Sequence, residues 1–354
     1  MPVNHALLRL VREALGKTQT DVAKTSGIAQ GTISKYEKGL QEPSPGQLAD
    51  LCKALDSFSP SFFEQDSRPS GVMYRSRVLR SVKLETTVRG RMNLIRFAVS
   101  RLLDDITVVE TTRFPEPDRQ YSSPEDAAIA LRRSWGIVPG PVQGLADLLE
   151  HAGGVVVPAD LGTEAVIAAY MNPLGDPRRW FFVNSRIDAG DRVRLSLAHE
   201  LGHAVMHGAT LVPESKEAEQ EAYRFGAEFL LPRADLLTEI PKRRLQLTDL
   251  YNLKLRFGVS MQAILMAAHR AGVVTDSHKI TLFKQISARG WRIHEPGEVP
   301  VERPFLLDEA LRILREEHGF SEDELERTAL VPRSVLADLL PGYFTTIKQG
   351  LRVV

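Results

Sequence analysis

The pattern that most restricts how this chain can fold is a pair of histidines four residues apart inside a long helical stretch. Residues 192–208 read RVRLSLAHELGHAVMHG, with His199, Glu200 and His203 at the centre. Residues four apart lie on one face of an α-helix, so both imidazoles can reach one metal ion, while Glu200 points about 100° away. The pattern predicts a helix with a metal-binding face.

The position of Glu200 fits a general base. A zinc ion with three protein ligands lowers the pKa of a bound water molecule to about 7, and a nearby carboxylate can then take its proton. The same carboxylate can return a proton to a leaving amine. The alternative is a helix with two ordinary surface histidines, but its apolar flanks and the carboxylate-rich helix that follows favour the metal site.

The third metal ligand is expected on that next helix, which the sequence predicts at residues 213–232. An apolar stripe runs along it, formed by Ala218, Ala222, Phe225 and Phe229. An adjacent face carries Glu217, Glu221 and Glu228. Glu217 and Glu221 repel each other unless a cation lies beside them. We choose Glu221, which is central on this face and borders the stripe, keep Glu217 as the substitute, and expect surface salt bridges for the others.

Three further residues could contribute to the site, namely His207, Tyr170 and Arg194. His207 continues the four-residue spacing, but it lies about 12 Å from His199 along the helix axis, too far to share one ion. We therefore interpret His207 as a residue behind the ligands or at the helix C-terminus, where its charge meets the negative end of the dipole. Tyr170 and Arg194 are the candidates for stabilising an oxyanion.

The N-terminal 67 residues contain short helical segments separated by glycine-containing turns, which is typical of a helix-turn-helix unit. Its second helix, from about Gln30 to Lys38, would enter the major groove of DNA. The residues expected on the exposed face are Gln30, Gly31, Thr32, Ser34 and Lys35. Gln30 can pair with adenine and Lys35 with guanine or phosphate, whereas Thr18, Gln19 and Lys38 would contact the DNA backbone. A module for dimerisation or protein contact alone is the alternative, because acidic and basic residues balance here.

The same segment resembles a known family. The run TQTDVAKTSGIAQGTISKYEKG, followed by EPS, is similar to the Cro and lambda-repressor-like (XRE) regulators. The resemblance implies a five-helix helix-turn-helix domain over residues 1–67 that binds double-stranded operator DNA. A two-fold dimer on a palindromic operator is the default for such a module.

Residues 165–232 resemble the ImmA/IrrE metallopeptidases, through RVRLSLAHELGH and through EAYRFGAEFLLP. The second run corresponds to that family's E-A-N-x-F-A-x-x-L-L-M-P signature, which places the third ligand on Glu221. The chain departs from it at Tyr223 and Leu231, neither of which is a ligand position. The resemblance implies a gluzincin-like zinc endopeptidase that cleaves repressor proteins. Mn²⁺ is the alternative ion for the same ligands. An XRE module ahead of such a peptidase is a familiar arrangement in bacterial regulators.

The length of 354 residues predicts two or three domains. The helical patterns indicate a mainly α-helical protein, and the resemblance to the ImmA/IrrE metallopeptidases implies an α+β zincin-like unit. We expect the helix-turn-helix over 1–67, a basic linker and helix over 68–123, the peptidase domain over 124–240 and a helical region over 241–354. The basic segment has two interpretations, a phosphate-contacting or dimer helix and a solvated connecting helix. The runs VVVP, VIAAYM and WFFVN predict strands, and Thr18 and Ser260 are expected to cap the helices that follow them. The helices at 245–275 are predicted to form a helix-turn-helix-like pair that closes the peptidase cleft, with a second DNA contact as the alternative. Those at 305–340 are expected to form a docking or dimerisation bundle.

Composition excludes several classes. Lys plus Arg and Asp plus Glu are both 45, so the chain as a whole is neither strongly basic nor strongly acidic. The single cysteine, Cys52, excludes an internal disulfide framework. No apolar run approaches the ~20 residues of a membrane span, and we expect a cytoplasmic protein. The rival function is a non-proteolytic repressor or antitoxin-like protein whose metal site is structural or sensory.

Overall fold

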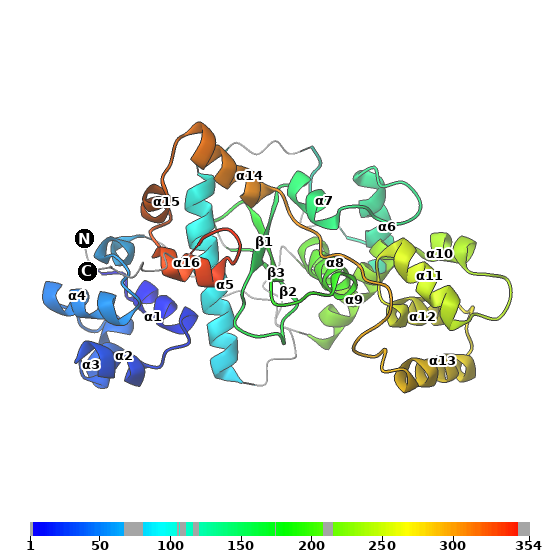
Figure 1. Cartoon of the computed structure of the whole chain (residues 1–354), viewed down its shortest axis with the longest axis horizontal. Coiled ribbons are helices and arrows are strands. Elements are labelled where there is room, and N and C mark those ends of the chain that lie inside the picture. The colour runs from blue at the N-terminus through cyan, green and yellow to red at the C-terminus, as the bar shows by residue number, and fades with distance from the viewer. Residues whose placement is uncertain are drawn as a thin grey trace, which may run out of the picture.

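The computed structural model describes residues 3–66, 81–104, 106, 111–115, 120–173, 175–207 and 215–345. Within these ranges the chain is mostly helical and contains one three-stranded sheet (Figure 1). The predicted fold class, several helical units around a small α+β unit, is confirmed. No helix among the described residues is both long enough and apolar enough to cross a membrane.

The N-terminal module consists of four α-helices and one 3₁₀-helix. They are α1 (His5–Ala14), α2 (Gln19–Ser26), α3 (Gln30–Glu37), α4 (Pro45–Ala54) and η1 (Pro60–Glu64). Thr18 caps α2 as the sequence predicts, because its hydroxyl accepts from the Asp21 amide while the Asp21 carboxylate accepts from the Thr18 amide. Gly27 then ends α2 in the left-handed conformation, with φ of 70°.

Helix α5 (Val82–Leu103) lies between this module and the sheet (Figure 1). Half of its residues are buried, on more than one side of the helix. It crosses α1 so closely that a Cβ at Gly90 would lie 2.6 Å from the Ala14 nitrogen. The described part of the predicted basic segment is therefore a core helix, and neither a solvated connector nor an exposed phosphate-binding helix describes it. Its remaining basic residues, Arg68, Arg75, Arg77 and Arg80, lie outside the described residues.

The sheet contains β1 (Gly154–Ala159), β2 (Ala168–Met171) and β3 (Arg179–Asn184) in the order β1-β3-β2. Strand β3 pairs in parallel with β1 and antiparallel with β2. Alternate side chains point to opposite faces. Val157 and Phe182 pack with α5 on one face, while Val156 and Phe181 join the helices of the other face. All three strands occur where the sequence predicts them.

The second face of the sheet is contacted directly by α7 (Leu145–His151) and α8 (Gly190–Met206), and a set of helices shares one hydrophobic core with this face. They are α6 (Pro124–Ser134), α7, α8, α9 (Lys216–Leu230), α10 (Arg233–Glu239), α11 (Leu247–Phe257), α12 (Met261–Arg270) and α13 (Asp276–Ala288). Between α11 and α12, Gly258 is left-handed and the Ser260 side chain accepts from the Ala263 amide. The predicted helix-turn-helix-like pair is present here.

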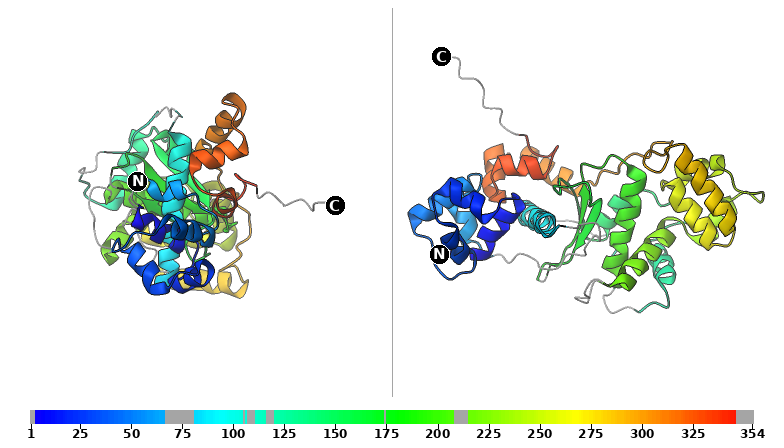
Figure 2. Two further views of the ribbon diagram at one scale, coloured as in Figure 1. Left: turned by 90° about the vertical axis from the view of Figure 1, so that its left-hand side faces the viewer. Right: turned by 90° about the horizontal axis from the view of Figure 1, so that it is seen from below.

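The last helices return to the first face. An arm from Arg289 to Phe305 leads past the start of α8, where the Gly190 amide donates to the Val299 carbonyl. Then follow α14 (Leu306–Arg312), a π-helical turn η2 (Ile313–Glu317), α15 (Glu322–Ala329) and α16 (Arg333–Leu339). They lie beside α5 and near the N-terminal module (Figure 2). The two parts of the predicted 241–354 region thus belong to different cores, and α14–α16 pack on α5 instead of forming a separate bundle.

Candidate metal centre and nucleic-acid interface

Two glycines set the distance between α8 and α9, the helices that carry the predicted ligands. A Cβ at Gly202 would lie 2.9 Å from the Ala222 carbonyl oxygen, and one at Gly226 would lie 2.8 Å from the His199 nitrogen. Any larger residue would collide with backbone at either crossing point. The two helix backbones are therefore in direct contact, and this contact brings α9 carboxylates within reach of the α8 histidines.

His199, His203 and Glu219 form one compact group of potential ligands. The Nε2 atoms of the histidines are 3.1 Å apart, and Glu219 oxygens lie 3.3 Å from His203 Nε2 and 3.6 Å from His199 Nε2. A tetrahedral ion with bonds of about 2.0–2.2 Å requires ligand atoms roughly 3.3–3.5 Å apart. The donor set and its spacing fit zinc, and within the described ranges no other group of three such ligands was found.

The electrostatics of this group favour cation binding. Burial opposes ionisation of Glu219, but hydrogen bonds with His199 and His203 outweigh it and hold the pKa of its carboxyl at about 2. Burial lowers the pKa of the His203 imidazole in spite of Glu219. A metal needs an ionised carboxylate and neutral imidazoles, so these two shifts favour it. For His199, burial lowers the pKa of the imidazole, but the hydrogen bond with Glu219 and the Glu200 charge outweigh it and raise the pKa, so a metal would have to displace a proton there.

Glu221, the ligand predicted from the sequence, is not brought to the two histidines. Its Oε2 lies 3.1 Å from Nε2 of His207, and its side chain is 43% exposed. His207 is the C-cap of α8, and its Nδ1 lies 3.3 Å from His203 Nδ1. The interpretation of His207 as a residue behind the ligands agrees with this geometry, whereas Glu221 as a ligand stays a sequence prediction. The substitute, Glu217, is exposed and also outside the ligand group.

The sequence analysis missed Glu219 because the apolar stripe of α9 has two flanks. At about 100° per residue, Glu221 lies on one flank and Glu219 on the other. Which flank faces the histidines depends on how α8 crosses α9, and spacing along one helix does not contain that information. The available signal was that Glu219, like Glu221, directly borders the stripe formed by Ala218 and Ala222.

Glu200 is buried beside the ligand group. Its burial raises the pKa of the carboxyl to about 8, although the positive charge of His199 and the Tyr170 backbone amide on β2 both oppose the shift. Its Oε2 has no hydrogen-bond partner among the described residues. A buried carboxylate oxygen of this kind is the acceptor that a substrate or a water molecule could occupy.

The oxyanion candidates have other surroundings. Arg194 forms an ion pair with Glu302 and donates to the Val142 carbonyl oxygen at 2.8 Å, on the side of α8 that faces the arm. Burial lowers the pKa of its guanidinium to about 10. The Tyr170 side chain is fully buried against Phe181. Arg194 is therefore paired on the arm side of α8, and the Tyr170 ring is part of the core between β2 and α8.

The predicted DNA-reading helix α3 presents its polar side chains outward. Gln30, Gly31, Lys35 and Lys38 are exposed, Gln19, Thr32 and Ser34 are half-buried, and Ile33 anchors the helix in the core. A chain of contacts fixes two of the amides. Gln30 Nε2 donates to Gln19 Oε1 at 2.6 Å, and Gln19 Nε2 donates to Glu37 Oε2 at 2.8 Å. Glu37 is itself paired with Arg12, so the Gln19 amide has one defined orientation.

Comparison with known proteins identifies both modules. Residues 8–63 match the helix-turn-helix family model, and residues 149–269 match the IrrE N-terminal-like domain of the M78 peptidases. The second match extends through most of α12. An uncharacterized HTH-type transcriptional regulator, y4dL of Sinorhizobium fredii, is 43% identical over 49 residues, which cover 14% of this chain and 25% of that relative. The chain therefore joins an XRE-type helix-turn-helix module to an IrrE/ImmA-like peptidase domain, as its sequence predicts.

Proposed function

We propose that this protein is a DNA-binding transcriptional regulator whose second domain is a zinc-dependent endopeptidase that cleaves a partner repressor. The observation that carries the enzymatic part is the ligand group of His199, His203 and Glu219 with the buried Glu200 beside it. The repressor as substrate rests on the resemblance to ImmA/IrrE peptidases. A peptidase domain and a DNA-binding module in one chain would bring enzyme and repressor to one operator.

The residues of the site have distinct roles in this proposal. His199, His203 and Glu219 hold the metal, and Glu219 replaces Glu221 as the third ligand. Zinc bound there would polarise a peptide carbonyl and acidify a water molecule. Glu200 would take a proton from the attacking water molecule and pass it to the leaving amine, two transfers that a buried carboxylate beside the ligand group can perform. Manganese is the alternative ion, because two imidazoles and a carboxylate also accept it.

In the regulatory module, α3 reads the operator. Gln30 would face adenine, and Lys35 would face guanine or a phosphate. Gly31, Thr32 and Ser34 would line the remaining groove contact, while Gln19 and Lys38 contact the DNA backbone. A homodimer on a palindromic site is the arrangement we expect.

The metal content of the purified protein tests the site. Elemental mass spectrometry should find about one zinc per chain in the wild type and in Gln220→Ala, an exposed change on the same helix. It should find none in His199→Ala or Glu219→Ala. A wild type that takes up no metal after zinc is supplied would refute the metal site.

Proteolysis needs a separate test. New protein N-termini in host cells should be compared between the wild type and Glu200→Gln, which keeps the ligands but removes the base. A cleaved DNA-binding protein should appear only with the wild type. The same set of N-termini in both strains would contradict the peptidase proposal while leaving the metal site intact.

One observation favours the second candidate, a regulator whose metal site is sensory. The core of the helix-turn-helix module continues through α5 to one face of the sheet, and α8, which carries the histidines, packs on the other face, so the sheet is the element that connects the metal site with the regulatory half. In that case removing zinc from Glu200→Gln should change operator affinity even though hydrolysis is absent. An affinity that does not depend on zinc would exclude this candidate.

A further inference from the structure

His203, a predicted metal ligand, is linked through His207 to the partly exposed carboxylate of Glu221 by a continuous row of polar contacts. His203 turns its Nε2 towards Glu219 and its Nδ1 towards Nδ1 of His207, at 3.3 Å. His207 turns its Nε2 towards Glu221 Oε2, at 3.1 Å. His203 is 1% exposed and His207 is 8% exposed, so the middle of the row is shielded from water. Among the described residues, the His199 imidazole has no comparable row behind it.

Only one arrangement of protons satisfies every contact in this row with neutral imidazoles. If His203 offers the lone pair of Nε2 to a metal, its proton must be on Nδ1, and His203 then donates to His207. His207 must accept at Nδ1, so its own proton lies on Nε2 and is donated to Glu221. A neutral imidazole has one donor and one acceptor nitrogen, so the tautomer of His203 determines the tautomer of His207.

We propose that His207 and Glu221 are positioning residues that fix the tautomer and the ring orientation of His203. The inference rests on the metal site proposed above. Ligand histidines are held in this way by a carboxylate, a carbonyl or water in many metal sites. Here the carboxylate acts through a second imidazole. This positioning role does not require Glu221 to be a ligand. It also explains why a third histidine, at the C-cap of α8, follows at the same spacing.

Zinc affinity, measured by competition with a chromophoric chelator, tests this proposal. Glu221→Ala should still bind one zinc but with an affinity about 10-fold lower, and His207→Ala should lose up to about 100-fold. Glu221→Gln keeps an oxygen that accepts from His207, so it should retain most of the wild-type affinity. Gln220→Ala, an exposed change on the same helix, is the matched control and should bind like the wild type.

The absorption spectrum of the Co²⁺-loaded protein gives a second readout. Its d–d bands report ligand geometry, so a ring of His203 that is no longer held should broaden or shift them in His207→Ala and Glu221→Ala. Thermal unfolding of the metal-free variants separates this effect from general destabilisation. A variant that unfolds like the wild type without metal yet shows the lower affinity supports positioning.

The outcomes distinguish this proposal from the one on which it rests. A wild type that binds no zinc overturns the metal site and the row together. A wild type that binds one zinc, with His207→Ala and Glu221→Ala equal to it in affinity and Co²⁺ spectrum, overturns the positioning role alone. Complete loss of binding in Glu221→Ala, with binding kept in Glu219→Ala, would make Glu221 the ligand and overturn the row.

Discussion

The two faces of the three-stranded sheet are covered in different ways. The face that carries the candidate metal centre shares a core with α6–α13 and is contacted by α7 and α8. The opposite face shares a core with α5, on which the N-terminal module and α14–α16 pack from both ends of the chain (Figure 2). The metal-binding half is thus built from one continuous stretch of the chain, and the regulatory half combines segments from both ends of the chain.

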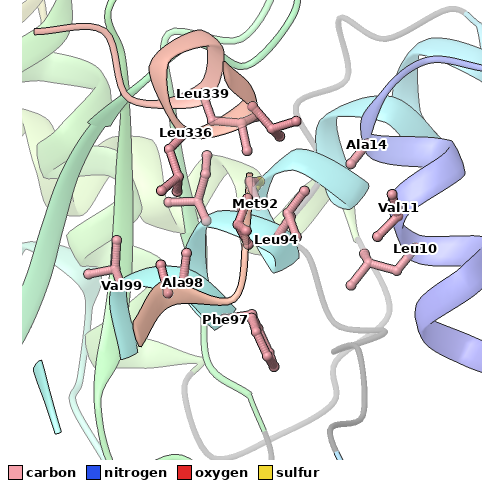
Figure 3. Packing of buried hydrophobic residues seen from close by; sticks show 14 of the residues in the cluster. Leu10, Val11, Ala14, Met92, Leu94, Phe97, Ala98, Val99, Leu336 and Leu339 are labelled. Atoms are coloured by element: carbon pink, nitrogen blue, oxygen red, sulfur yellow. The ribbon is translucent and has the colours of Figure 1, made fainter. Parts of the chain in front are cut away.

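This difference shows that the DNA-binding module packs against the rest of the protein and is not merely tethered to it by a flexible linker. Leu10, Val11 and Ala14 of α1 pack on one side of α5, and Leu336 and Leu339 of α16 pack on another side (Figure 3). Removing either partner would expose apolar surface of α5 to water. We therefore expect the helix-turn-helix module to depend for its stability on the last helices of the chain.

The largest effect is expected for Leu336→Ala. Leu336 is fully buried in the cluster around α5, and truncation of such a leucine costs about 2–5 kcal/mol. Chemical denaturation monitored by circular dichroism should show this loss, and operator affinity should fall although the change is far from α3 in sequence. Leu237→Ala, at a leucine that is 44% exposed, is the control and should change stability little. Unchanged operator binding in a destabilised Leu336→Ala protein would mean that the module stands alone.

The same contrast explains how much of the fold can be predicted from sequence. The strands, the helix of residues 190–206 and the caps at Thr18 and Ser260 follow from local patterns, and the structure contains all of them. The burial of α5 was not predicted, because its arginines favour a solvated helix. Arg91 in fact binds the Asp160 carbonyl oxygen and the Asp338 carboxylate, both distant in sequence.

The candidate site follows the same rule at a smaller scale. His199, Glu200 and His203 lie on one helix, so their spacing alone predicts their arrangement. The carboxylate that completes the ligand group comes from a second helix. Whether this carboxylate belongs to Glu219 or to Glu221 depends on how α8 and α9 cross at Gly202 and Gly226, and this crossing is a tertiary contact. Sequence spacing therefore predicts the histidine pair and leaves the third ligand open.

A smaller, pH-dependent effect on stability is expected where α7 of the metal-binding half contacts the start of α14. Glu150 of α7 accepts hydrogen bonds from the amides of Phe305 and Leu306 at the start of α14. Burial raises the pKa of its carboxyl to about 7 in spite of these bonds, and the Asp147 charge adds to the shift. Below a pH of about 4.5, the ordinary pKa of a glutamate, Glu150 is neutral in the folded and in the unfolded protein, and its burial adds no pH-dependent loss of stability. As pH rises towards 7, the unfolded chain loses this proton first, so the raised pKa lowers stability.

Glu150→Gln removes this titration and keeps an oxygen for the two amides. Its stability relative to the wild type should rise between pH 4.5 and 7 by up to about 3 kcal/mol, and then stay level. Urea unfolding of both proteins across this range measures the difference, in which all other titrating groups cancel. A free energy of unfolding that differs between the two proteins by the same amount at every pH in this range would show that Glu150 is ionised in the folded protein. The contact between α7 and α14 would then not lower stability as pH rises.

The smallest change in stability, and the most direct comparison of the two halves, is expected from adding one methyl group at each close crossing. In Gly90→Ala the Cβ meets Ala14 backbone, and in Gly226→Ala it meets His199 backbone. Both collisions are with helix backbone at less than 3 Å, so each costs about 3 kcal/mol, the upper end of the usual range, while replacing a helical glycine returns about 1 kcal/mol. Stability should therefore fall by about 2 kcal/mol. Gly90→Ala should weaken operator binding and leave zinc binding intact, and Gly226→Ala should do the reverse. Loss of both activities in either variant would show that the two faces respond as one unit.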